Sequence, residues 1–146
     1  MKLPIVTLFV LLLFQFIVAQ PAEDDKIGSL IVIITGLENN DGEVLIAVSN
    51  SREDYESDDP SFIWVNVKIE NRKAEYTFEE LPFGEYGIKL FHDENMDGEL
   101  DSNFLGIPTE DYGFSNNARG TFGPADYDDA KFIFNQSELT MEISVD

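Results

Sequence analysis

Residues 28–35 read GSLIVIIT, and this stretch decides the fold class. Four consecutive β-branched residues, Ile31 to Ile34, favour extended backbone over helix. A continuous apolar run of this length between glycines is typical of a strand that is buried on both faces. Residues 36–42, which end in Asp41-Gly42, predict a hairpin connection to a return strand at residues 44–48.

Short apolar or alternating segments continue to the end of the chain. They predict five more strands, at residues 62–69, 74–78, 86–91, 130–134 and 139–145. The last two would form a hairpin through residues 135–137. Residues 49–60 are polar and acidic and indicate a loop, whereas residues 104–129 are rich in Gly, Asn, Pro and aromatic residues and predict a long, ordered loop. Seven short strands without a helix predict an all-β fold, a seven-stranded antiparallel β-sandwich of the transthyretin-like or Ig-like kind.

The first 19 residues have the pattern of a secretory signal peptide. Met1-Lys2 is a short positive start, residues 3–18 are almost entirely apolar, and Ala19 supplies a small residue for cleavage. A membrane anchor is the alternative, but the apolar run is short for a span of roughly 20 residues. We therefore expect an exported protein, periplasmic or extracellular, with an acidic leader at residues 20–27, one domain at residues 28–146 and no transmembrane segment in the mature chain.

The composition is strongly acidic. Asp and Glu number 29 against 9 Lys and Arg, so the formal net charge is -20. Such a surface repels nucleic acid and anionic lipid and attracts divalent cations and basic partners. The chain contains no cysteine, so disulfides cannot stabilise it outside the cytoplasm. We expect its stability to come from the hydrophobic core and from a bound ion.

Residues 93–101, DENMDGELD, have the spacing of a calcium-binding loop. Oxygen-bearing side chains recur at the first, third, fifth and ninth positions, glycine at the sixth position allows a sharp turn, and the seventh position offers its main-chain carbonyl. Ca²⁺ takes about six to eight oxygen ligands in flexible geometry, whereas Mg²⁺ prefers fewer protein ligands. We therefore predict a Ca²⁺ cofactor. Its predicted ligands from the loop are Asp93, Asn95, Asp97, Glu99 and Asp101.

The loop departs from the calcium-binding pattern at the twelfth position, where Phe104 replaces a bidentate glutamate. Glu110 is our first choice for the missing ligand, with Asp111 and the Asp128-Asp129 pair as alternatives. Without that glutamate we expect weak binding, with a dissociation constant of about 10⁻⁴ to 10⁻³ M. The competing interpretation is an acidic turn that is held by its own Asp and Asn hydrogen bonds.

Few residues point to catalysis. His92, the only histidine, is more often a hydrogen-bonded structural residue in such a position, and no spacing supports a triad of His92 with Ser102 or Ser115. Trp64, Tyr112 and Phe114 would suit a sugar-stacking platform, but we expect Trp64 to lie in the core.

Three longer motifs lie in the second half of the chain: LPFGEY at residues 81–86, HDENMDGELD at residues 92–101 and GIPTEDYGFSNN at residues 106–117. Together they resemble the bacterial family known as domain of unknown function 2141 (DUF2141), and the resemblance covers nearly all of the chain after the predicted signal. It implies an exported protein with no established activity, in which Glu110 and residues 114–117 fold beside the ion loop. A more distant similarity to transthyretin-like and collagen-adhesin B-type modules concerns the fold alone.

These observations favour an exported, non-enzymatic, Ca²⁺-stabilised β-sandwich that binds an unknown protein or glycan or has a structural role. We predict no catalytic residues and no organic cofactor. The alternative is a secreted or periplasmic hydrolase with its site near His92 and the loop at residues 104–129. It is less favoured because no nucleophile and base are recognisable in the chain.

Overall fold

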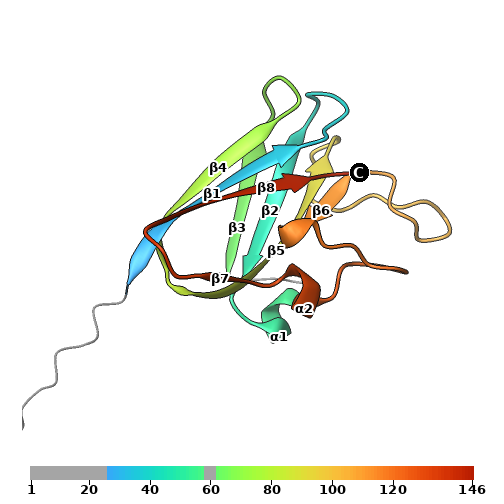
Figure 1. Ribbon diagram of the computed structural model, residues 1–146. Helices are drawn as coiled ribbons and strands as arrows, with labels where there is room; N and C mark the ends of the chain where they lie inside the picture. The colour runs from blue at the N-terminus through green and yellow to red at the C-terminus, as the bar shows by residue number, and fades with distance from the viewer. Residues whose placement is uncertain (1–25, 58–61) are drawn as a thin grey trace, which may run out of the picture.

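A computed structural model describes residues 26–57 and 62–146 of the chain. Within these residues it contains eight strands in two sheets and three short helical turns (Figure 1). Their bounds are β1 Ile27–Thr35, β2 Glu43–Ser49, α1 Arg52–Tyr55, β3 Ile63–Lys68, β4 Ala74–Pro82, β5 Gly84–Asp93, β6 Tyr112–Phe114, η1 Ser115–Asn117, α2 Tyr127–Ala130, β7 Phe132–Phe134 and β8 Glu138–Ser144. The predicted signal peptide at residues 1–19, and the acidic leader except for its last two residues, lie outside the described residues. Across the described residues, no helix has the length and apolar character needed to cross a bilayer.

The two sheets differ in width and in strand direction. In the first sheet, β1 lies between β4, to which it is antiparallel, and β8, to which it is parallel. In the second sheet the order is β3-β2-β5-β6, and all neighbours are antiparallel. The long strand β5 also pairs with β7 near its start. The prediction of a mostly β fold is confirmed, although the strands number eight, not seven, and one pair is parallel.

The inner faces of both sheets share one hydrophobic core. In β1 every second residue, Leu30, Val32 and Ile34, is completely buried. The other sheet and β7 contribute a matching set of buried residues, which includes Val44, Ile46, Val48, Ile88, Leu90 and Phe134. This alternation is the period of two that a strand with one inner face requires.

Strand β1 is therefore not buried on both faces, and that prediction was wrong. Ile31 and Ile33 point to the outer face and are only partly buried. Their neighbours across the sheet include Thr77 and Glu142, which are exposed polar residues. An apolar run of this length does not distinguish a central strand in a three-stranded sheet from a strand that is covered on both sides.

Both predicted hairpins were also wrong. Residues 36–42 connect β1 to β2, which lies in the other sheet, and residues 135–137 connect β7 to β8 in the same way. The glycines at both ends of the first connection have positive φ, 91° at Gly36 and 65° at Gly42, so the chain does turn there. Leu37 is buried and anchors this connection to the core. A turn signal specifies a local bend, whereas strand partners are chosen by non-local packing.

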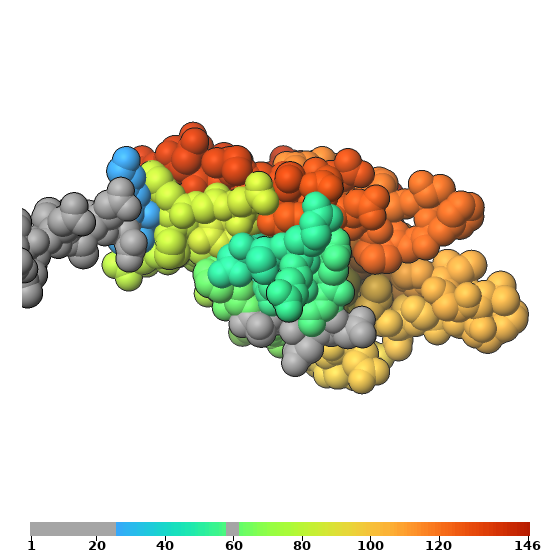
Figure 2. Space-filling model, turned by 90° about the horizontal axis from the view of Figure 1, so that it is seen from below, coloured from blue at the N-terminus to red at the C-terminus, as the bar shows by residue number. Residues whose placement is uncertain are grey.

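The two predicted loops contain short elements. Helix α1 begins after Ser51, whose Oγ accepts a hydrogen bond from the Asp54 amide at 3.2 Å, and this N-cap lies inside the predicted loop at residues 49–60. The predicted ordered loop at residues 104–129 contains β6 and η1, and α2 begins within it. Figure 2 shows the chain around residues 100–125, in gold and orange, extending from the end of the molecule opposite the start of β1.

Candidate functional site

The predicted ion loop starts at the buried end of β5. Asp93 pairs with Glu43 of β2 and is 1% exposed. Its Oδ1 accepts a hydrogen bond from the Asp97 amide at 3.2 Å, and its Oδ2 accepts one from the Gly98 amide at 2.8 Å. Gly98 has a φ of 81°, a conformation that glycine adopts without strain. The loop therefore folds back onto the carboxylate of its first residue.

Asn95 brings two carboxylates together above this turn. Its Nδ2 donates to Asp97 Oδ2 and to Asp101 Oδ2, both at 3.0 Å. Its Oδ1 accepts the Asp97 amide at 3.0 Å, and Asp97 Oδ1 accepts the Glu99 amide at 2.9 Å. Three of the predicted ligand side chains, those of Asn95, Asp97 and Asp101, are therefore adjacent, and all three residues are exposed. Among the described residues, the Glu99 side chain makes no such contact, and its predicted role as a ligand through the main-chain carbonyl stays a prediction.

Glu110 is hydrogen-bonded to both ends of the ion loop. It is 8% exposed, and its Oε1 accepts the Glu94 amide while its Oε2 accepts the Asp101 amide, both at 3.0 Å. The carboxylate therefore joins the two ends of the loop through main-chain amides. Its place beside the loop agrees with the implication of the family resemblance.

Of the alternative ligands, Asp128 has a carboxylate that is engaged by basic side chains. Asp128 on α2 pairs with Arg52 at 2.7 Å and with Lys131 at 3.0 Å, and these hydrogen bonds hold the pKa of the Asp128 carboxyl below its usual value. Asp111 uses its main-chain oxygen to accept the His92 amide at 2.8 Å. Across residues 26–57 and 62–146, no group of three or more His, Cys, Asp or Glu side chains is arranged to hold a metal ion. The contacts of the predicted ion loop instead join one amide, that of Asn95, to the carboxylates of Asp97 and Asp101.

His92 is buried and hydrogen-bonded to the main chain, as expected for a structural residue. It is completely buried, and its Nε2 lies 2.7 Å from the main-chain oxygen of Asp41, so Nε2–H donates to that carbonyl. Its Nδ1 lies 3.8 Å from Glu94 Oε1 and has no hydrogen-bond partner in the part of the chain that the structure describes. Glu94 Oε1 also accepts from Asn39 Nδ2 at 2.8 Å. His92 and Glu94 thus attach the connection at residues 36–42 to the start of the ion loop.

Ser115 is also engaged with main-chain groups. It is completely buried, its Oγ accepts the Ile88 amide at 2.9 Å, and its hydroxyl donates to the Ala130 carbonyl at 2.6 Å. Asn116 Nδ2 donates to the carbonyls of residues 129–131. Asn117 Oδ1 accepts the Ser144 amide at 2.8 Å on β8. The segment that begins at Ser115 therefore fastens α2 and β8 to β5, and its side chains do not form a nucleophile with His92.

Trp64 lies on the outer face of the second sheet, and its predicted core position was wrong. It is 45% exposed. In register it lies beside Ala47, which lies beside Lys89 and then Phe114, so one row of side chains crosses four strands. The sequence could have shown that Trp64 faces outward. Side chains alternate between the two faces of a strand, so Trp64 shares its face with Asn66, a polar residue two positions further along β3.

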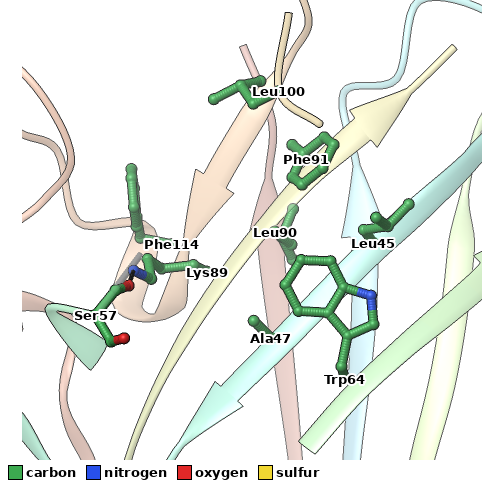
Figure 3. A pocket seen from close by; sticks show the side chains of 9 residues that line it. All are labelled: Leu45, Ala47, Ser57, Trp64, Lys89, Leu90, Phe91, Leu100 and Phe114. Carbon is green, nitrogen blue, oxygen red and sulfur yellow. Dashed lines mark hydrogen bonds between the residues drawn. The ribbon is translucent and has the colours of Figure 1, made fainter. Parts of the chain in front are cut away.

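This outer face is hollowed. A depression of about 360 Å³ lies between Trp64 at one side and Phe114 at the other, with Ala47 between them and Leu45 beside Phe91 (Figure 3). Leu45 and Ala47 face outward and are nevertheless 2% and 5% exposed. Sequence reasoning considered an aromatic platform of Trp64, Tyr112 and Phe114 but favoured a core position for Trp64. It did not find the depression, which depends on the pairing of distant strands.

Comparison with known proteins identifies one family. A family model described as "Uncharacterized protein conserved in bacteria (DUF2141)" matches residues 32–142. The matched region extends from the middle of β1 into β8 and contains the ion loop, Glu110 and the outer-face depression. Searches of curated proteins and of solved structures gave no match. The match covers most of the chain and confirms the resemblance in its motifs, and the chain therefore belongs to the DUF2141 family of bacterial proteins.

Proposed function

We propose that this protein is an exported, non-enzymatic β-sandwich that binds Ca²⁺ at residues 93–101 and serves as a binding or structural module in the periplasm or at the cell surface. The observation that carries the proposal is the contact of the Asn95 amide with the carboxylates of Asp97 and Asp101, at 3.0 Å each. Two carboxylates and an amide that are this close supply several oxygens of the kind that Ca²⁺ prefers.

The remaining ligands follow from the loop. Asn95 would contribute Oδ1 after rotation of its amide, Asp97 and Asp101 their carboxylates, and Glu99 its carbonyl. Asp93 supports the turn through two amides, and its carboxylate lies at the base of the same loop. An ion here would supply positive charge that offsets the repulsion between the loop carboxylates, and it would bind only to the folded state, so its role would be to stabilise the fold.

Glu110 has a different role in this proposal. A direct bond from Glu110 to the ion would require it to release the amide of Glu94 or of Asp101. We therefore assign it to positioning the loop, with solvent water completing the coordination shell. Because the loop supplies few carboxylates and most of them are exposed, we expect a dissociation constant in the millimolar range, which suits the calcium concentrations found outside cells.

Thermal unfolding of the chain from residue 20 onward tests the proposal. With a dissociation constant of about 1 mM, about 10 mM Ca²⁺ stabilises the folded state by about 1.4 kcal/mol. That corresponds to a rise of roughly 5 °C in melting temperature. Asp97→Asn should abolish most of this rise, whereas Glu79→Gln, which removes an exposed acid from β4, should keep it. Equal shifts in the two variants, or an equal effect of Mg²⁺, would show that calcium acts only through the general acidity of the chain.

A further inference from the structure

The outer face of the second sheet differs from the rest of this acidic surface. The exposed face of an antiparallel sheet is ordinarily polar. Here its central rows carry Leu45, Ala47, Trp64, Phe91 and Phe114. No Asp or Glu is among the described residues that line the depression, although the chain contains 29 of them. Solubility does not explain seven apolar residues around one depression in such an acidic chain.

The depression has the form of a small-molecule site. Its volume of about 360 Å³ lies within the range of roughly 300–1,000 Å³ that is usual for ligand sites. Three of its walls, Trp64, Phe91 and Phe114, are aromatic rings on paired strands, so their positions are set by the sheet and not by a loop. Leu100, from the predicted ion loop, closes a further side. Rigid aromatic walls suit the stacking of a ring.

The polar groups of the lining exclude several ligand classes. Lys89 and Ser57 are the polar residues among those described. Lys89 extends toward Ser57 and away from Trp64 (Figure 3), and its Nζ lies 4.9 Å from the centre of the Tyr55 ring and 3.5 Å from the Ser57 carbonyl oxygen. Among the described residues of the lining, a cationic ligand would find no carboxylate, and an anionic ligand would be opposed by the net charge of the chain. An oligosaccharide would leave most of its hydroxyl groups without partners.

We propose that this depression binds an uncharged, largely apolar ring compound. The ring would lie between Trp64 and Phe114 over Ala47, and Leu100 would cover it. The proposal goes beyond the calcium-dependent role proposed above and does not require it, because the walls on β2, β3, β5 and β6 exist without the ion.

Trp64 is the only tryptophan in the chain, so its fluorescence reports on the depression directly. We would titrate the chain from residue 20 onward with 3-phenylpropan-1-ol, in buffer containing a calcium chelator, and follow the Trp64 emission. We expect saturable quenching or a blue shift at millimolar concentration or below. Leu100→Ser should weaken binding about tenfold, because it removes a large part of the apolar cover. Leu105→Ser, five residues further along the chain and outside the depression, should change the affinity less than twofold.

A second variant fills the site without removing any wall. Ala47→Met places a longer apolar side chain on the floor and should abolish the titration. Thr77→Leu, which enlarges an exposed residue on the outer face of the other sheet, should leave it unchanged. The proposal is overturned if Trp64 emission does not respond, or if 3-phenylpropionate or an oligosaccharide such as cellohexaose binds more tightly than the alcohol. Because calcium is absent from these titrations, their failure is separate from a failure of the calcium proposal.

Discussion

Glu110 and Asp101 are joined by a hydrogen bond of 3.0 Å from the Asp101 amide to Glu110 Oε2, while the other Glu110 oxygen accepts the amide of Glu94. A single buried carboxylate thus holds both ends of the ion loop. The loop is therefore shaped by main-chain contacts from a residue that follows it in the sequence, in addition to the hydrogen bonds within it.

Glu110→Gln should lower the free energy of unfolding by about 1–3 kcal/mol, because the amide nitrogen of Gln cannot accept a hydrogen bond from one of the two buried main-chain amides. Urea unfolding monitored by circular dichroism measures the change. Glu99→Gln, an exposed neighbour whose side chain supports nothing in the loop, should change stability by less than about 0.5 kcal/mol. If Glu110 only positions the loop, the calcium-dependent rise in melting temperature persists in Glu110→Gln. If that rise disappears while the variant remains folded, Glu110 is a ligand.

Asn95→Asp should have opposite effects on the loop without calcium and with calcium. Without calcium, a third carboxylate beside Asp97 and Asp101 replaces two donated hydrogen bonds with repulsion, so the variant should be less stable than the wild type by about 1 kcal/mol. With calcium, the additional negative ligand strengthens binding, so the rise in melting temperature should be larger than in the wild type. Differential scanning calorimetry in chelator and in calcium measures both effects.

Asn103→Asp is the matched control for that substitution. Asn103 Oδ1 accepts the amides of Leu105 and Ile107 at 2.9 Å and 3.2 Å, and an Asp carboxylate can accept both. This variant adds the same charge two residues beyond the ion loop, outside the group of Asn95, Asp97 and Asp101. An identical gain in calcium response from both variants would assign the effect to net charge and not to a site.

The sequence predicted the parts of this structure that depend on local pattern. Residues 28–35 do form a strand, and the spacing of residues 93–101 identified side chains that lie together in the fold. Strand partners depend on which apolar faces meet in the core, and this explains why residues 36–42 cross between sheets instead of closing a hairpin. The strand β6 has only three residues, too few to show a period, so the sequence did not reveal it.

The contacts of Glu110 and the depression beside Trp64 could not be predicted from the sequence, because both depend on residues that are far apart in the chain. The two main-chain amides that Glu110 accepts are separated from it by 16 and 9 residues, and spacing alone does not show such contacts. The face on which Trp64 lies follows from the alternation of β3, but the depression depends on its alignment with Phe114, fifty residues later.

Alkaline pH should destabilise the protein through Tyr127. Burial, followed by the hydrogen bond of 3.1 Å from its hydroxyl to Glu85 Oε1, raises the pKa of Tyr127 from 10.0 to about 12. The raised pKa means that the folded state keeps a proton which the unfolded state has lost. This contribution to stability is complete below about pH 10 and is lost as the pH rises through about 12. Tyr127→Phe should make the unfolding free energy fall less steeply between about pH 10 and 12. In a pH titration followed by phenolate absorbance, the variant should have one fewer tyrosine that ionises at high pH. A fall of the same slope in the variant would assign alkaline unfolding to other groups, among them Tyr55, whose pKa is also raised by burial.

Two glycines at the site allow a matched comparison. A Cβ at Gly42 would lie 1.9 Å from the main-chain oxygen of Asp93, whereas a Cβ at Gly98 would have no atom within 4 Å. Both residues have positive φ, 65° and 81°, so an alanine at either position costs about 1–2 kcal/mol in backbone strain. Only at Gly42 does a clash with rigid backbone add to this strain, because the connection at residues 36–42 packs directly against the end of β5.

Gly42→Ala should therefore destabilise the protein by about 3 kcal/mol or more, and Gly98→Ala by about 1 kcal/mol, as measured by urea unfolding. The calcium-dependent rise in melting temperature should be affected more by Gly98→Ala than by Gly42→Ala. Gly98→Ala strains the turn that brings Asp97 and Glu99 together, so it should reduce the calcium-dependent rise in melting temperature. Gly42→Ala, if it remains folded, should keep most of that rise, because residue 42 contributes no predicted ligand. Equal losses of stability in the two variants would mean that the close approach of Gly42 to Asp93 is readily relieved, and that the connection at residues 36–42 does not hold the start of the loop in place.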